Sequence, residues 1–383
     1  MTVVPADITA VVQTIHNTPT KIVLEFAGAG AFALGWLHSV GGSSRTILEA
    51  TDRYAAASLQ DCIHFEAEKV VSRGVAVAMA SAAYQRAQAL ADDSTPLAGI
   101  GCTATIATDR TKRGDHHCWV AAYTATHLIT LNLALTKGLR DRDEEEQLVS
   151  RLILQAVAAA CGVDDTLPFS LSTEEAILEN REPVALLDQL LARSLQTVTL
   201  SPDGQLIANE PIKQVVMLSG SFNPLHQGHR QMVEVAAQKL GRSLYFELPL
   251  LNADKPAIAS AEALRRGSQF LDYAPLVYTG APLFKEKAAI FPNTVFVVGY
   301  DTATRLIEPR FYNHDPAEMT AAFEQIRIAG CRFFVAGRLK NDRFLTWRDL
   351  NLPFEFHDLF DGTTEREFRV DVSSTELRQQ NHE

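Results

Sequence analysis

Two histidines, His226 and His229, stand where the residue pattern of this chain best suits a chemical reaction. They follow the loop sequence Gly-Ser-Phe-Asn-Pro at residues 220–224, which an apolar run at residues 215–218 precedes. An apolar run, a Gly/Ser/Asn/Pro loop and then helical periodicity predict a strand, a tight loop and a helix. The first N–H groups of a helix have no partners inside it, and the helix dipole favours an anion there. Two imidazoles at this position suit a reaction at a phosphorus atom, so we expect nucleotidyl transfer.

A second pattern of this kind occupies residues 368–378. A short strand-like run reaches Ser373, Ser374 and Thr375, whose hydroxyl and N–H groups can cap a helix and bind an anion. Arg378 follows one turn later, on the same face of the expected helix. A capped helix start with an arginine suits a polyphosphate tail. The two patterns together predict a divided triphosphate site.

Further strands are expected to bring charged residues to this site. The apolar run at residues 294–298 leads to Gly299 and Asp301, and other apolar runs lead to Lys255 and Arg338. Asp301 either faces the nucleotide or caps the helix expected after it. Lys255 and Arg338 are either site cations or solvated charges at strand ends.

In combination, these residues resemble the nucleotidylyltransferase superfamily, which carries a His-x-Gly-His motif near its start and a Ser-Ser-Thr-x-x-Arg motif near its end. The resemblance covers residues 212–383 and implies a Rossmann-like domain with a parallel sheet. It implies catalytic roles for His226, His229 and Arg378. The nucleotide-binding residues that it implies are Gly220, Ser221, Phe222, Asn223, Gly228, Lys255, Gly299, Asp301, Arg338, Ser373, Ser374 and Thr375. No metal-ligating residue is implied, because Mg²⁺ would accompany ATP and be held by phosphate oxygens and water.

The acceptor is less closely specified than the reaction. The Ser-Ser-Thr-x-x-Arg pattern and the long insert before it resemble nicotinamide or nicotinate mononucleotide adenylyltransferases, and the Arg-Thr-Glu-Gly segment of glycerol-phosphate cytidylyltransferases is missing. Residues 299–307 nevertheless depart from the usual adenylyltransferase segment. The expected function is adenylyl transfer from ATP to a pyridine mononucleotide, a step of NAD biosynthesis. The alternatives are nucleotidyl transfer to another small phosphorylated acceptor, and a nucleotide-binding sensor.

The first part of the chain predicts a separate α/β domain at residues 1–165. A strand at residues 21–26, a loop with Gly28 and Gly30, and a helix resemble the C-terminal domain of the CinA family. Some members of that family are nicotinamide mononucleotide deamidases with a serine nucleophile, but Phe26 occupies the serine position here. The resemblance therefore implies that amide hydrolysis is lost, and it implies a homo-oligomer formed through this domain.

Two features of this domain have a second interpretation. Gly28 and Gly30 serve either the packing of helix on strand or the binding of a ligand. The adjacent His116 and His117 can form a basic anion site, although a solvated loop is the more common role of such a pair.

Composition supports a two-domain α/β protein. A chain of 383 residues exceeds one typical core, and residues 166–211 are expected to link the domain at 1–165 to that at 212–383. The net charge of −11 argues against a general nucleic-acid binder. Five scattered cysteines, with neither a signal-peptide pattern nor a membrane-length apolar run, predict a cytoplasmic protein without a membrane partner. The expected partners are small nucleotides.

Overall fold

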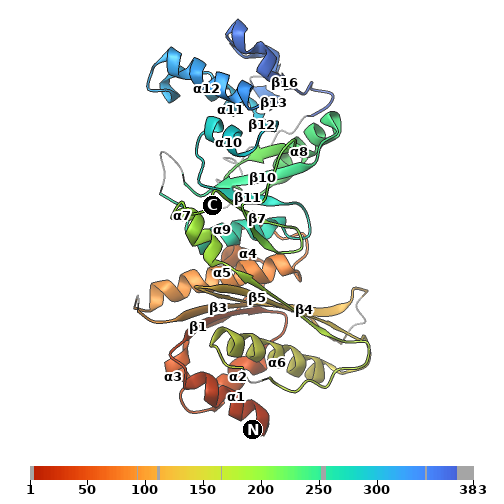
Figure 1. Cartoon of the computed structure of the whole chain (residues 1–383). Helices are drawn as coiled ribbons and strands as arrows, with labels where there is room; N and C mark the ends of the chain where they lie inside the picture. Colours follow the sequence, from red (N-terminus) through yellow and green to blue (C-terminus); the bar gives the residue numbers. More distant parts are fainter. Residues whose placement is uncertain are drawn as a thin grey trace. The chain divides into compact units, whose positions relative to one another are not determined.

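The computed structural model describes residues 4–92, 94–109, 113–164, 166–251, 256–340 and 343–368. The chain forms two compact units (Figure 1). The N-terminal unit comprises Met1–Asp188 and Ala259–Asp272, and the C-terminal unit comprises Gln189–Ile258 and Tyr273–Glu383. Each unit is built on its own mixed sheet with helices, so the predicted α/β class is confirmed.

The N-terminal unit contains a six-stranded sheet in the order β2-β1-β3-β4-β5-β6. Its strands are β1 (Lys21–Ala27), β2 (Ile47–Asp52), β3 (Leu97–Thr105), β4 (His116–Thr124), β5 (His127–Leu135) and β6 (Ile177–Pro183). β1 runs parallel to β2 and β3, whereas β3 to β6 pair in antiparallel fashion. The strand predicted at residues 21–26 is found in this sheet as β1.

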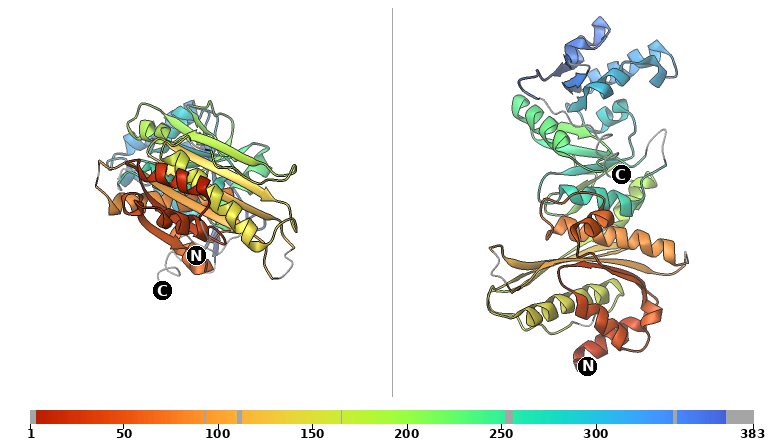
Figure 2. Two further views of the ribbon diagram at one scale, coloured as in Figure 1. Left: turned by 90° about the horizontal axis from the view of Figure 1, so that it is seen from below. Right: turned by 180° about the vertical axis from the view of Figure 1, so that it is seen from behind.

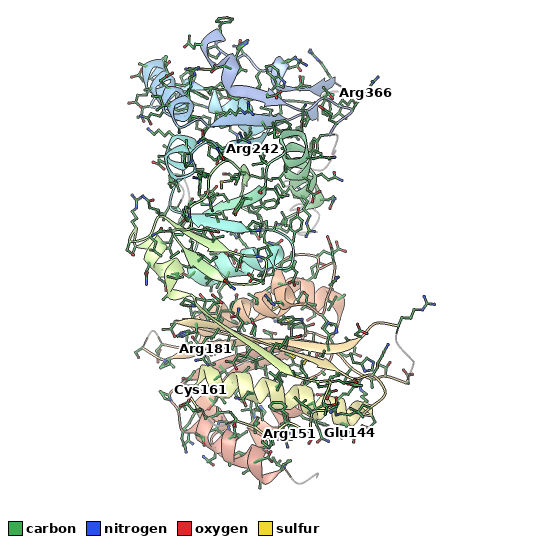
Figure 3. The ribbon with its side chains drawn as sticks, turned by 45° about the vertical axis from the view of Figure 1, so that its right-hand side comes forward. Glu144, Arg151, Cys161, Arg181, Arg242 and Arg366 are labelled. Carbon is green, nitrogen blue, oxygen red and sulfur yellow. The ribbon has the colours of Figure 1, made fainter. Side chains whose placement is uncertain are left out.

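Helices cover both faces of this sheet, with α5 on one face and α6 on the other (Figures 1 and 2). The helices of the unit are α1 (Ala6–His16), α2 (Ala31–Ser39), α3 (Ser43–Thr46), α4 (Ala56–Ile63), α5 (Arg73–Leu90), α6 (Arg142–Ala160), α9 (Ser260–Gly267) and the 3₁₀ turn η1 (Ser268–Phe270). α6 begins with a capping box, because the Asp141 side chain accepts from the Glu144 N–H and the Glu144 side chain accepts from the Asp141 N–H. Arg151, halfway along α6, lies 2.5 Å from Asp7 and so joins α6 to α1 (Figure 3).

The C-terminal unit contains an eight-stranded sheet in the order β16-β13-β12-β9-β10-β11-β7-β8. The strands are β7 (Thr197–Leu200), β8 (Leu206–Ala208), β9 (Val216–Ser219), β10 (Leu244–Pro249), β11 (Leu276–Thr279), β12 (Val295–Gly299), β13 (Arg332–Ala336) and β16 (Phe360–Gly362). A separate hairpin pairs β14 (Arg338–Lys340) with β15 (Arg343–Leu345). The helical segments are α8 (Gln227–Leu240), α10 (Phe284–Ile290), α11 (Tyr300–Leu306), η2 (Pro309–Phe311), α12 (Pro316–Ile328), η3 (Trp347–Asp349) and η4 (Phe354–Leu359).

The six strands from β16 to β11 are parallel, and only β7 and β8 are antiparallel. Central parallel strands are covered on both faces, which explains the continuous apolar runs that identified them. In β12 and β13, four successive residues are buried, and Phe296 and Phe333 lie in the hydrophobic core. At the C-terminal end of α8, Arg242 donates to the Asn293 carbonyl oxygen at 2.6 Å and joins the loops before β10 and β12 (Figure 3).

Residues 166–211, expected to be a linker, contribute strands to both sheets. β6 pairs with β5 of the N-terminal unit, and β7 pairs with β11 of the C-terminal unit. α7 (Ala185–Leu191) lies between β6 and β7 in sequence and includes the boundary between the two units. β6 is an edge strand, β7 lies beside the edge strand β8, and both pair with a strand that is distant in sequence, which a local pattern does not reveal. Within the described ranges, no helix is long and apolar enough to cross a membrane.

Candidate functional site

The loop at residues 220–225 follows the central strand of the C-terminal sheet. β9 lies between β10 and β12 and runs parallel to both, with Leu218 opposite Val297 of β12. The chain proceeds from β9 to β10 and β11 on one side, and later adds β12 and β13 on the other. Ligands of such sheets bind outside the carboxyl ends of the strands where the strand order reverses. β9 and β12 are parallel neighbours, so the loop after β9 and the start of α11, which directly follows β12, both lie at this edge of the sheet.

Packing of Phe222 fixes the shape of the loop. Phe222 is 1% exposed, and its ring meets the rings of Phe246 and His229 edge-on, at centroid distances of 5.5 and 5.3 Å. A Cβ atom on Gly220 would lie 2.7 Å from the Phe222 ring, so this position needs glycine. The Phe222 backbone has a φ of 42°, and the Asn223–Pro224 bond that follows is cis. Phe222 therefore serves the site through its backbone, while Ser221 and Asn223 are exposed.

The two histidines lie together at the start of α8. Their rings stack with centroids 3.6 Å apart, and His226 is the N-cap residue. The His226 N–H donates to Nδ1 of His229 at 3.4 Å, which leaves the His229 proton on Nε2. Burial lowers the pKa of both rings, and with the added effect of His226 the pKa of His229 falls to about 3. Both imidazoles are therefore neutral at neutral pH when no anion is bound.

Two further candidate residues, Asp301 and Arg338, form an ion pair. Gly299 ends β12 and is the N-cap residue of α11, so Asp301 lies in the first helical turn and is not its cap. A carboxylate in the first turn interacts favourably with the helix dipole. The two side chains are 43% and 44% exposed, so the pair adds little stability and remains accessible to a ligand.

The remaining candidates divide into one buried residue and five that the structure does not describe. Gly228 is buried in the first turn of α8. Lys255, Ser373, Ser374, Thr375 and Arg378 lie outside the described residues, so the second half of the divided site stays a prediction. Within the described ranges, no group of three or more His, Cys, Asp or Glu side chains gathers to hold a metal ion.

Sequence reasoning missed a buried ion pair next to the loop. Glu247 of β10 and Lys287 of α10 lie 2.5 Å apart, with their side chains 0% and 3% exposed. No local spacing connects two residues that are 40 positions apart in the chain. Only the pairing of β9 with β10 brings Glu247 opposite Ser219, the residue before the loop.

In the N-terminal unit, the glycines of the first loop serve packing. A Cβ atom added to Gly28 would lie 2.1 Å from the carbonyl oxygen of Ala104. A Cβ atom added to Gly30 would lie 2.4 Å from a methyl group of Ile153. Phe26 is 5% exposed and belongs to the hydrophobic core of the unit. Gly28 also lines a pocket of about 230 Å³, so its packing role does not exclude contact with a ligand.

This pocket contains two arginines and several hydroxyl groups. Arg53, Arg142, Tyr54, Thr103 and Thr108 line it together with small apolar side chains. Arg53 also holds the buried Glu25 carboxylate with two hydrogen bonds, of 2.7 and 3.1 Å. Cations and hydroxyl groups in an otherwise apolar pocket suit a small anionic ligand.

The structure places both His116 and His117 in β4, so neither residue lies in a solvated loop. His116 begins β4 and is 6% exposed. Its Nδ1 lies 2.9 Å from a carboxylate oxygen of the fully buried Glu145 in α6. The other Glu145 oxygen accepts from the Ala107 N–H at 2.6 Å. His116 is therefore part of a buried polar network, whereas His117 remains partly exposed.

Comparisons with known proteins found one family model and several solved structures that match parts of the chain. Residues 217–380 match the family model described as Cytidylyltransferase-like. The competence/damage inducible protein CihA from Agrobacterium tumefaciens is 21% identical, over 42% of this chain and 99% of that one, with a TM-score of 0.33. A competence-damaged protein (CinA) superfamily protein from Klebsiella pneumoniae is 15% identical, over 41% and 94%, with a TM-score of 0.29. Another from Escherichia coli is 16% identical, over 41% and 91%, with a TM-score of 0.25.

No curated protein matches the chain. The two expected resemblances are thus found in separate parts of the chain: residues 217–380 match the Cytidylyltransferase-like family model, and the N-terminal region matches CinA superfamily structures.

Proposed function

We propose that the C-terminal unit transfers an adenylyl group from ATP to nicotinamide or nicotinate mononucleotide, forming a dinucleotide and pyrophosphate. The observation that carries this proposal is the junction of β9 and α8. There, a Gly-x-Phe loop at the reversal of strand order leads directly to the stacked His226 and His229. This arrangement offers backbone N–H groups and two imidazoles to one anion.

The reaction needs no protein nucleophile. A phosphate oxygen of the acceptor attacks the α-phosphorus of ATP, the new P–O bond forms, and the bond to the β-phosphate oxygen breaks to release pyrophosphate. The barrier depends on aligning the anions and on stabilising charge at the non-bridging and leaving oxygens. ATP enters with its Mg²⁺, whose ligands are mainly phosphate oxygens and water.

Each described residue has a specific role in this scheme. The Nε2–H group of His229 donates to a phosphate oxygen, because its Nδ1 already accepts from the His226 N–H. The backbone near Ser221 and Phe222 holds non-bridging oxygens. Arg338, paired with Asp301, interacts with the phosphates of a bound nucleotide. We expect Ser373, Ser374, Thr375 and Arg378, which lie outside the described residues, to hold the β- and γ-phosphates.

The choice of acceptor rests on resemblance, and a direct assay tests it. Pyrophosphate release is measured with ATP or CTP across a panel of phosphorylated acceptors. We expect release with ATP and a pyridine mononucleotide. Release with CTP and another small phosphate would instead support the cytidylyl transfer that the matched family description suggests. Absence of release with every pair would contradict both forms of the proposal.

A second function, nucleotide sensing by the N-terminal unit, is favoured by its pocket. The pocket contains Arg53 and Arg142, while Phe26 stands where deamidases of the CinA family carry their serine. We expect this unit to bind nicotinamide mononucleotide without releasing ammonia, and to associate with a second copy of itself. Titration calorimetry and an ammonia assay test the first expectation, and sedimentation tests the second. Clear deamidation would contradict the assignment of a non-catalytic role.

A further inference from the structure

Four polar side chains meet at the carboxyl ends of three adjacent strands in the C-terminal unit. Ser219 ends β9, Glu247 lies in β10, Thr279 ends β11 and Lys287 lies in α10. One Glu247 oxygen accepts from the Ser219 hydroxyl and the Lys287 ammonium group, each at 2.5 Å. The other accepts from the Thr279 hydroxyl at 2.5 Å. Lys287 also donates to the Ser219 hydroxyl at 3.1 Å. Ser219, Glu247 and Lys287 are therefore each hydrogen-bonded to the other two.

This network is unusually well shielded from water. Glu247 and Thr279 are fully buried, and Lys287 is almost fully buried. Removing two charges from water costs on the order of several kcal/mol for each ion, and apolar replacements of buried pairs are often as stable. A contribution to stability alone is therefore a weak explanation for an ion pair at this place. A role in fixing the geometry of the adjacent chain explains it better.

The network is connected directly to the loop at residues 220–225, which is called the phosphate-binding loop after its proposed role. Ser219 immediately precedes Gly220, and the Gly220 N–H donates to the backbone oxygen of Glu247 at 3.0 Å. Glu247 thus holds the end of β9 through its side chain and its main chain. The loop that starts here leads to His226 and His229, and misplacing such groups by about 1 Å can cost about 10²-fold in rate.

We propose that Glu247 and Lys287 are positioning residues, which act through Ser219 to fix the start of the phosphate-binding loop for transfer. The inference rests on the proposed nucleotidyl transfer and extends its machinery to two residues that do not touch substrate. The ion pair holds the Ser219 hydroxyl in one orientation, because the hydroxyl donates to the carboxylate and accepts from the ammonium group.

Ser219→Ala and Thr279→Val form a matched pair of variants for the test. Each removes one hydroxyl donor at 2.5 Å from the same carboxylate and leaves the Glu247–Lys287 pair intact. Only Ser219 leads into the loop. We expect similar melting temperatures for both, with kcat lowered about tenfold or more in Ser219→Ala and within about threefold of wild type in Thr279→Val. Equal kcat values in the two variants would overturn the proposal.

A double variant separates positioning from stability. Glu247→Leu combined with Lys287→Met removes both charges and approximately keeps the side-chain volumes, so no charge remains buried without a partner. We expect this protein to fold with a melting temperature close to that of wild type while its kcat is reduced about tenfold or more. A folded double variant with wild-type kcat would show that the pair does not position the loop.

A measurement without substrate keeps this inference distinct from the proposed function. The NMR signals of the His226 and His229 rings, assigned with single His→Asn variants, report directly on the loop. We expect Ser219→Ala to shift both signals and Thr279→Val to leave them near their wild-type positions. Signals unchanged in both variants would contradict positioning. Wild-type protein that releases no pyrophosphate with any acceptor would contradict the proposed function alone.

Discussion

The imidazole rings of His226 and His229 stack with their centroids 3.6 Å apart at the first turn of α8. Protonating both rings would place two positive charges in contact, and burial already disfavours the charged form of each. Without a bound anion, the two imidazole rings are therefore neutral and act as hydrogen-bond donors. Charge enters only with the substrate, so protonation of the pair should depend on ligand binding.

The stability of the C-terminal unit should depend on pH through His229. Burial lowers the pKa of His229 to about 3 in the folded protein, whereas an exposed imidazole titrates near about 6.5. The folded state therefore binds fewer protons in this interval, so the stabilising contribution is complete above about pH 6.5 and decreases as the pH falls towards 3. His229→Asn should lose less stability than wild type between pH 7 and 5. Hydrogen exchange in peptides of the C-terminal unit measures this, with the exposed His357→Asn as control.

An equal loss of protection in wild type and His229→Asn over this pH range would contradict the assigned burial effect.

A bound triphosphate should reverse the pKa shift. Its negative charge favours protonation of one ring of the pair, so ATP binding at about pH 6 should take up protons and ATP affinity should rise as the pH falls. Titration calorimetry in buffers of different ionisation enthalpy counts the protons. We expect positive uptake in wild type and reduced uptake in His229→Asn. Zero uptake in wild type would show that the phosphates do not approach the ring pair.

Gly220→Ala should damage the loop more than the fold. The added methyl group would lie 2.7 Å from the Phe222 ring, so Phe222 or the backbone must move, at a cost of about 1–3 kcal/mol. We expect kcat/KM to fall about tenfold or more. Gly280→Ala in the same unit is the control, because its methyl group would meet Leu251 at an ordinary 3.5 Å. Similar kinetics in the two variants would show that Phe222 does not hold the loop.

The segment at residues 259–272 should stabilise the N-terminal unit, although it lies in the second half of the sequence. Arg265 of α9 is 3% exposed and donates to the Ile63 carbonyl oxygen at 2.7 Å. Arg265→Ala should therefore cost about 2 kcal/mol or more. Both Arg265 and Arg266 form ion pairs with the Glu262 carboxylate, at 2.6 and 2.7 Å. Arg266→Ala, which removes only one of these two pairs and no contact to Ile63, should cost less. Hydrogen exchange in α4 and α5 distinguishes the two, and equal effects would contradict a specific role of Arg265.

Local signals in the sequence were enough to predict the strand, loop and helix formed by β9 and α8. The apolar run, the Gly-x-Phe loop and the two histidines are contiguous, and each has a direct physical meaning. The partners of His116 and Glu247 could not be predicted in this way. Glu145 lies 29 residues after His116, and Lys287 lies 40 residues after Glu247, so only the tertiary fold brings each pair together. β6 and β7 were missed for the same reason, since pairing with a distant strand determines them.

The most direct test of the central claim is pyrophosphate release by wild type and His229→Ala, measured with ATP and nicotinamide or nicotinate mononucleotide. His357→Ala, an exposed histidine of the same unit, is the matched control. We predict steady release by wild type and the control, and a loss of about 10²–10³ in kcat for His229→Ala, with the melting temperature little changed. Near wild-type turnover in a folded His229→Ala protein would contradict the account.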